Sequence, residues 1–330
     1  MSPPAAGAAE AATRTGGGRA RGGRARGGLA LVLTEHMNGI IDGLFRVQAA
    51  LVYTFLYLPI VVVIIFAFNE NRLATIWTGF TTDWFGVALN NAVIVKSLGN
   101  SAFVALFNAV LATLFGTLAA LGLQRVSKRV RLTYDVLTYV SIIVPEIVIA
   151  LATLVFFATT FDIVNPILSD LQGGGKGVFK LGFGTYTIIA AHVLFNTSLV
   201  LLLVRARLSG MDRTLVEASQ DLFATAWQTF RQITFPQLLP AVVAGFLLAF
   251  TFSFDDYVIT NFVTGPGSTT LPIYIFGQVK RGVTPETNAV ATMVLAFTVG
   301  MLLIGQFLLT WQGRRTGGRQ TSMTAIVTER

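Results

Sequence analysis

Residues 49–68 read AALVYTFLYLPIVVVIIFAF, an apolar run that contains no charged side chain. The hydrocarbon core of a bilayer is about 30 Å thick, and a helix needs about 20 apolar residues to cross it. The run is continuously apolar, whereas a barrel strand would alternate between apolar and polar residues. The sequence therefore predicts an all-α integral membrane protein with six transmembrane helices. The five later helices are expected at 101–122, 136–160, 185–204, 241–264 and 288–311.

The composition agrees with a membrane protein. Of 330 residues, 53% are hydrophobic and 12% are charged, whereas a soluble domain carries about 25% charged residues. This excludes an ordinary soluble enzyme. Cysteine is absent and histidine occurs only at His36 and His192, so neither a disulfide nor a cysteine or multi-histidine metal site is expected. We expect a chain that does no covalent chemistry and holds no cofactor of its own.

Lysine and arginine are distributed unevenly between the two sides of the predicted membrane. The segments on the side of the N-terminus hold 18 of them, and the opposite segments hold 6. Because positive charge stays on the cytoplasmic side during insertion, both termini are predicted to be cytoplasmic. The net charge of +8 then reflects topology and not nucleic-acid binding.

The remaining segments flank this membrane domain. Residues 1–34 are rich in Gly, Ala and Arg and are predicted to form a disordered basic tail that is a candidate for contact with anionic lipid. Residues 35–48 are compatible with an amphipathic helix on the membrane surface. Residues 49–311 form the six-helix domain, and residues 312–330 form a second cytoplasmic tail.

Residues 205–240 form a long internal segment of mixed charge, for which the pattern predicts helix, turn and helix. Asp212 is placed to cap a first helix that runs through Leu222. A second helix is expected over 226–233, and it ends before Pro236 because a proline disfavours helix at the preceding residue.

This segment resembles the EAA motif of ABC importer permeases. In that motif Glu-Ala-Ala is followed by three residues, a glycine, nine residues and Ile-x-Leu-Pro. In the family this segment is a coupling helix that docks into a groove on a cytoplasmic ATPase. The resemblance implies the type I ABC importer permease fold. It assigns ATPase coupling to Glu217, Ala218, Ser219, Phe223, Ile233 and Pro236.

Three positions depart from the motif. Ser219 replaces the second alanine, Phe223 replaces the glycine and Phe235 replaces the leucine. The glycine matters most, since a bulky residue with positive φ costs about 1–2 kcal/mol. Either the turn is rebuilt, or Phe223 packs into the partner subunit. The alternative for Glu217 is a solvated surface glutamate.

Other strings resemble the spermidine/putrescine importer permeases of the same superfamily. They include residues 253–257 (SFDDY), 262–267 (FVTGPG) and 144–148 (VPEIV). The resemblance implies a multi-pass protein of the bacterial inner membrane that carries a polyamine. Its implied partners are two ATPase subunits that bind ATP and Mg²⁺, a second permease subunit, either a paralogue or a copy, and a periplasmic solute-binding protein.

Three acids within the predicted spans need an explanation: Glu146, Asp255 and Asp256. An ionised side chain at mid-bilayer costs about 2.5–3.5 kcal/mol, so such residues face a protein interior or an aqueous path. On continuous helices, Glu146 is expected near the midplane and Asp255 in the outer half. A path lined with carboxylates suits a cationic solute, and Phe254 and Tyr257 add aromatic faces for ammonium groups.

Alternatives remain at each level. The acids can instead hydrogen-bond neighbouring helices or pair with a cation on a partner subunit, and only one of the two adjacent aspartates is expected to face a path squarely. His192 and Asn196, one turn apart, favour interhelical hydrogen bonds. For the whole chain, the alternatives are an importer permease for another solute, such as a cationic amino-acid derivative or a phosphonate, and a stand-alone ion-coupled carrier.

Overall fold

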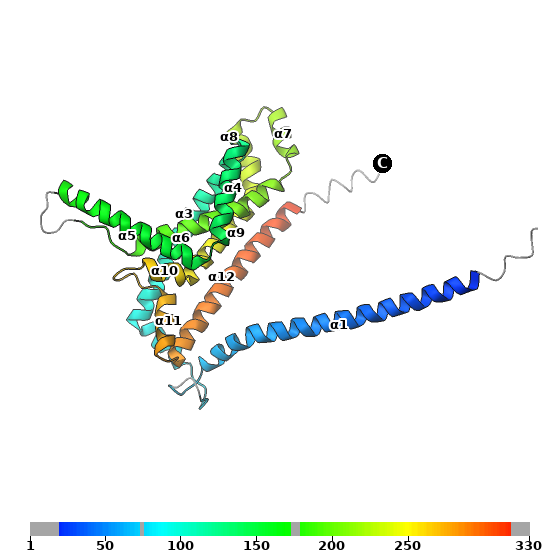
Figure 1. Ribbon diagram of the computed structural model, residues 1–330, viewed down its shortest axis with the longest axis horizontal. Helices are drawn as coiled ribbons and strands as arrows, with labels where there is room; N and C mark the ends of the chain where they lie inside the picture. The colour runs from blue at the N-terminus through cyan, green and yellow to red at the C-terminus, as the bar shows by residue number, and fades with distance from the viewer. Residues whose placement is uncertain (1–19, 73–75, 173–178, 318–330) are drawn as a thin grey trace, which may run out of the picture. The chain divides into compact units, whose positions relative to one another are not determined.

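The computed structural model describes residues 20–72, 76–172 and 179–317, and within these residues the chain is mainly helical (Figure 1). The helices are α1 (Ala20–Phe66), α2 (Asp83–Asn90), α3 (Ala92–Gly122), α4 (Lys128–Ile143), α5 (Glu146–Leu171), α6 (Thr185–Ser209), α7 (Thr214–Asp221), α8 (Ala226–Thr229), α9 (Phe235–Asp255), α10 (Val258–Val263), α11 (Leu271–Arg281) and α12 (Pro285–Gly317). A π-helical turn, Phe230–Thr234, joins α8 to α9.

The chain divides into two compact units between Val63 and Ile64. The first unit contains most of α1, which is one continuous helix. The helix therefore includes residues 20–34, which were predicted to be disordered, and shows no boundary at residue 48, where an interfacial helix was expected to end. The rest of the predicted tail, residues 1–19, lies outside the described residues.

Six described helices are long and apolar enough to cross a membrane, as predicted. They are Ile41–Phe66, Ala92–Gly122, Glu146–Leu171, Thr185–Ser209, Ala226–Asp255 and Pro285–Phe307. The fourth and sixth agree with the expected positions to within five residues at each end, whereas the first and second begin eight and nine residues earlier than expected. The third and fifth do not agree with the expected positions, because each predicted span is interrupted in the structure.

The third predicted span, residues 136–160, breaks between α4 and α5. Val144 is extended (φ −63°, ψ 131°), and Pro145 separates the two helices. Proline lacks the N–H that would continue the helix and disfavours helix at the residue before it. Glu146 therefore opens α5 and does not lie within a continuous helix.

The fifth predicted span, residues 241–264, breaks at Asp256, which is extended (φ −66°, ψ 126°) between α9 and α10. The Asp256 carboxylate accepts hydrogen bonds from the backbone N–H groups of Ile259 (3.3 Å) and Thr260 (2.7 Å). A short polar side chain that satisfies the first N–H groups of a helix favours a new start over a continued helix. The two aspartates therefore do not share one helical surface.

The core of the second unit lies where α3, α6 and α9 pack side by side (Figure 1). Small residues permit this close approach, as is common between membrane helices. A Cβ atom on Gly116 of α3 would lie 2.8 Å from the Cβ of Val200 on α6, and one on Gly245 of α9 would lie 3.2 Å from Val200 Cγ1. Val200 therefore fills the space between two glycines.

Candidate functional site

The segment between α6 and α9 begins with helix α7, whose first residue is hydrogen-bonded to Asp212. Asp212 Oδ1 accepts hydrogen bonds from the backbone N–H (2.9 Å) and the hydroxyl (2.7 Å) of Thr214, the first residue of α7. These hydrogen bonds lower the pKa of Asp212. The predicted helix is thus present, although it ends at Asp221, one residue before the expected Leu222.

The turn after α7 has the geometry that a glycine would normally adopt. Phe223 has φ +60°, and it is the one non-glycine residue with positive φ in the part of the chain that the structure describes. The N–H of Phe223 donates to the Gln220 carbonyl (2.9 Å), and the N–H of Ala224 donates to the Ser219 carbonyl (3.0 Å). This pair of bonds is a Schellman motif. The turn is therefore not rebuilt around Phe223, and the left-handed conformation costs about 1–2 kcal/mol.

Ser219, which stands in place of an alanine, joins α7 to α8. Its side chain is 6% exposed, and its Oγ lies 2.9 Å from Thr229 Oγ1 and donates to the Val216 carbonyl at 2.7 Å. Thr229 is 7% exposed. The substitution therefore introduces a buried hydrogen bond between the two short helices.

Most other residues of the predicted coupling set are accessible. Glu217 and Ala218 on α7 and Pro236 on α9 are exposed, and Ile233 is half-buried. The expected helix end before Pro236 is wrong. The chain continues through the π turn into α9, and Pro236 is the second residue of that helix.

A second polar cluster lies inside the helical unit, around His192 of α6. His192 Nδ1 is 2.7 Å from Ser253 Oγ, and His192 Nε2 is 3.0 Å from Asp256 Oδ2. Thr260 of α10 donates its hydroxyl to Asp256 Oδ2 at 2.6 Å. The Asp256 side chain is only 5% exposed. His192 therefore bonds between helices, as predicted, and Asp256 is enclosed by protein groups.

Glu146 joins the same cluster from α5. Its carboxyl group interacts with that of Asp256, and it lies in the first turn of α5, where the helix dipole favours a negative charge. Unlike Asp256, Glu146 is exposed. The break at Pro145 and the break at Asp256 thus bring together two acids that are far apart in the sequence.

Asp255 has different surroundings from its neighbour. It is exposed and lines a groove of about 310 Å³ between the end of α9, α11 and α12. The rings of Tyr257 and Phe276, which also line the groove, have centroids 4.2 Å apart. The ammonium group of Lys280 lies 4.8 Å from the centroid of Phe276. One aromatic face beside Asp255 therefore already attracts a cation.

Phe254 does not offer a free aromatic face. It is 3% exposed, and its ring centroid lies 5.7 Å from that of Phe250 and 5.6 Å from that of Phe297. Although Phe254 borders the groove, it belongs to the core. This departs from the expectation that Phe254 lines a path beside Tyr257.

Four residues that surround the acids were not predicted from the sequence as part of the site: Ser253, Thr260, Phe276 and Lys280. Ser253 and Thr260 lie three residues before and four residues after Asp256, a spacing that would place both near it on a helix. Phe276 and Lys280 have the same four-residue spacing in α11, a signal for a cation over an aromatic ring. These signals become specific only when the partner helix is known.

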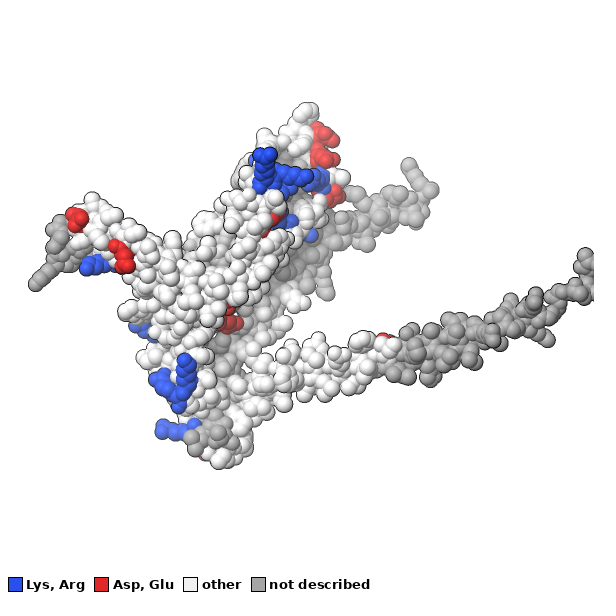
Figure 2. All heavy atoms as spheres, in the orientation of Figure 1, with Lys and Arg blue, Asp and Glu red and all other residues white. Residues whose placement is uncertain are grey.

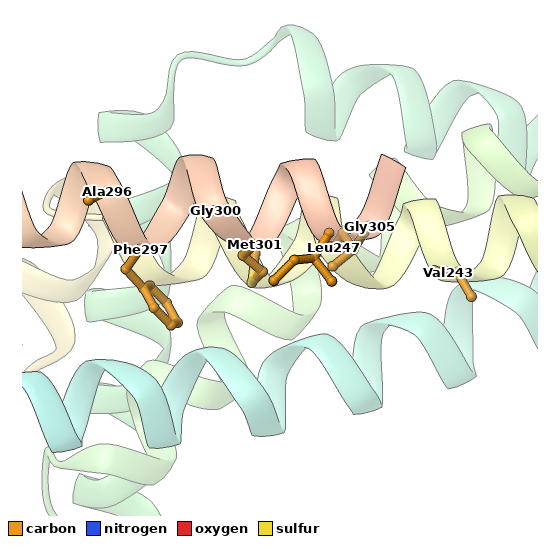
Figure 3. A pocket seen from close by; sticks show the side chains of 8 residues that line it. Val243, Leu247, Ala296, Phe297, Gly300, Met301 and Gly305 are labelled. Atoms are coloured by element: carbon orange, nitrogen blue, oxygen red, sulfur yellow. The ribbon is translucent and has the colours of Figure 1, made fainter. Parts of the chain in front are cut away.

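A second groove lies between α9 and α12 (Figure 3). Its volume is about 370 Å³, and its lining is Val243, Leu247, Ala296, Phe297, Gly300, Met301, Ile304 and Gly305. A Cβ atom on Gly305 would overlap the Leu247 side chain, so glycine allows the two helices to approach. Because its lining side chains are all apolar, this groove has no side chain that would bind a cation. Among the described residues, no cluster of three or more His, Cys, Asp or Glu side chains is suited to a metal.

The sequence matches the family described as "Binding-protein-dependent transport system inner membrane component" over residues 112–318. The match covers the interrupted helices, the segment from α7 to α8, the core helices α6 and α9, and the last part of α3. The chain belongs to this family of membrane permeases. Its predicted identity as an ABC importer permease subunit is therefore confirmed, and ATP hydrolysis belongs to a separate subunit.

Similar proteins lie within one branch of the family. The spermidine/putrescine transport system permease protein PotC of Escherichia coli (strain K12) is 36% identical over 257 residues, which cover 78% of this chain and 90% of PotC. The putrescine transport system permease protein PotI of the same organism is 36% identical over 244 residues, covering 74% and 82% of the two chains.

A solved structure has the same fold. It is the crystal structure of a bacterial ABC transporter involved in the import of the acidic polysaccharide alginate, with a TM-score of 0.67 and 15% identity, covering 85% of this chain and 98% of that one. The family assigns the chain to importer permeases and not to stand-alone carriers. Helices interrupted beside acidic residues, as at Pro145 and Asp256, are thus not confined to carriers.

Proposed function

We propose that this chain is the permease subunit of an importer for a polyamine of the spermidine/putrescine type. The similarity to PotC along most of both chains carries the proposal. The groove beside Asp255 supports it, because it combines one exposed carboxylate with two aromatic rings and an apolar lining. A polyamine has the matching chemistry, with ammonium groups separated by methylene segments.

In this proposal the path is shared with a second permease subunit, either a paralogue or a copy of this chain. Glu146, Asp255 and Tyr257 contribute to it from this side. Asp256 supports the path indirectly, since its hydrogen bonds hold the start of α10 in place. Phe254 supports it from the core through its packing against Phe250 and Phe297.

The coupling segment is proposed to contact two ATPase subunits, which hold ATP and Mg²⁺ in the assembled transporter. Its exposed residues Glu217 and Ala218 on α7 are available to a partner. Ile233 and Pro236 connect this surface to α9, because the chain runs from α8 through the π turn into that helix without a loop. A displacement of α7 and α8 by the ATPase therefore reaches Asp255 at the far end of α9.

A periplasmic solute-binding protein is proposed to deliver the polyamine from the side opposite the coupling segment. Both termini are then cytoplasmic, and the protein lies in a bacterial inner membrane. The chain itself contributes two conformations of different stability, and the partners shift the balance between them.

Uptake by the complete transporter tests the cargo. Proteoliposomes that contain both permease subunits, the ATPase and the binding protein are expected to accumulate radiolabelled putrescine or spermidine with ATP. Asp255→Asn and Glu146→Gln should lower the uptake rate about tenfold while assembly is retained. Asp170→Asn, which changes an exposed acid near the end of α5, is the control. Accumulation of neither polyamine, with uptake of another solute, would contradict the assigned cargo.

Recovery of the ATPase tests the coupling surface. Glu217→Lys reverses a charge on the exposed face of α7 and should abolish both ATPase co-purification and uptake. The matched control Asp170→Lys makes the same charge change elsewhere. Wild-type recovery of the ATPase with Glu217→Lys would return Glu217 to the role of a solvated glutamate.

A further inference from the structure

Helix α4 packs against α6 with one of its faces. On that face Thr138 is 6% exposed, and Asp135 forms an ion pair with Arg205 of α6. The opposite face is uncovered in the described part of the chain, and it carries four large apolar side chains: Leu132 (65% exposed), Val136 (53%), Tyr139 (52%) and Ile143 (76%). Because these residues follow one another at steps of four, three and four, they form one continuous stripe along the helix. We call them the α4 stripe.

Basic side chains gather where the α4 stripe begins. Residues 123–134 contain no acid and four basic residues: Arg125, Lys128, Arg129 and Arg131. Arg131 folds the connection from α3 back onto α4, since its guanidinium donates to the carbonyls of Leu123 (3.1 Å) and Gln124 (3.2 Å). The other three are exposed, and none of them forms an ion pair within the described residues. Figure 2 shows basic side chains at the end of the unit where Figure 1 labels α4 and α8.

We propose that the α4 stripe and its basic end bind an anionic phospholipid. Lys128 and Arg129 pair with the phosphate of the headgroup, and an acyl chain lies along the stripe. From Arg129 to Ile143 the helix rises about 21 Å, which exceeds half of the hydrocarbon thickness of about 30 Å. One lipid of a single leaflet can therefore contact both parts of the site. The site does not depend on the cargo, and in the proposed orientation it faces the cytoplasmic leaflet, whose surface is negative.

Two observations favour a lipid over a protein as the occupant. Between residues 132 and 143 the only charged residue is Asp135, which is paired with α6, so the stripe runs uncharged into the membrane domain, where a soluble protein does not reach. Close helix contacts in this unit are made at Gly116, Gly245 and Gly305, and small residues are typical of contacts between membrane helices. The α4 stripe contains only large side chains, which suit flexible acyl chains better than a second helix.

Quenching by brominated lipids tests which lipid lies on the stripe. Because the chain has no cysteine, Val136→Cys provides a single site for a fluorophore in the full-length permease, reconstituted with brominated phosphatidylglycerol or brominated phosphatidylcholine. The anionic lipid should bind about fivefold more tightly at low salt, and the preference should disappear at high salt, which screens the charges. The same label at Val155→Cys, an exposed position on α5, a helix without basic residues, should show no preference.

Removal of charge separates a defined site from a general attraction of the basic side. Lys128→Gln combined with Arg129→Gln should abolish the preference at Val136→Cys. The matched control, Arg213→Gln combined with Arg231→Gln, removes two exposed charges from the same side of the membrane domain and should retain it.

Three results would overturn the lipid site. The first is equal affinity of the two lipids at Val136→Cys, and the second is a preference that survives the loss of Lys128 and Arg129. The third is the absence of quenching by either lipid, or its loss when the other transporter subunits are added, because a protein would then cover the α4 stripe.

Discussion

Asp255 and Asp256 are adjacent in the chain but belong to different environments. Asp255 is exposed in the groove beside Tyr257. Asp256, in contrast, is hydrogen-bonded to His192 and Thr260, and His192 is in turn hydrogen-bonded to Ser253. The difference arises because the backbone leaves the helical conformation at Asp256. One carboxylate is thereby available to a solute, and the other is committed to the fold.

Substitutions of the two aspartates should consequently have different effects on stability. Asp256→Ala removes one partner of the buried pair with His192 and leaves the backbone N–H groups of Ile259 and Thr260 without their acceptor, so we expect a loss of about 3 kcal/mol in stability. Asp255→Asn should leave the unfolding temperature unchanged. Thermal unfolding in detergent measures both variants. Equal unfolding temperatures for wild type and Asp256→Ala would contradict the assigned hydrogen bonds.

At the scale of elements, the short helices α7 and α8 depend on one buried hydrogen bond. Ser219→Ala restores the alanine of the EAA motif but leaves Thr229 without its bond to Ser219 Oγ. We expect a local cost of about 1 kcal/mol and a roughly fivefold faster amide exchange in α7 and α8, measured by mass spectrometry. Ser209→Ala is the control, since Ser209 bonds only within α6. Unchanged exchange would show that packing alone holds the two helices.

For the whole molecule, stability depends on the close contact between α3 and α6. Gly116→Ala places a methyl group 2.8 Å from Val200 Cβ and 3.0 Å from the Leu201 backbone nitrogen, and overpacking of this kind costs about 1–3 kcal/mol. The expected result is a lower unfolding temperature and a lower yield. Gly99→Ala, on the same helix with open space around it, should be neutral or stabilising. Equal stability of the two variants would contradict this packing.

The topology is a second property of the whole molecule. Single cysteines introduced at Ser2 and Arg330 should react with a membrane-impermeant maleimide only after cells are opened, whereas one at Thr269 should react in intact cells. The cysteine-free background allows this measurement. Labelling of the terminal positions in intact cells would reverse the orientation predicted from the 18 and 6 basic residues on the two sides.

The sequence alone determined the number of spans and the class of protein, because apolar runs and the EAA pattern are local. It also placed the coupling turn at Phe223, where an aromatic residue stands at a glycine position. It did not determine the two helix breaks, since the Asp256 carboxylate favours a new helix only where His192 and Thr260 surround it. Only the tertiary structure decided that Glu146 meets Asp256, that Asp255 faces a groove and that Phe254 lies in the core. Such contacts depend on which helices pack together. The pattern of apolar residues along one segment does not contain that information.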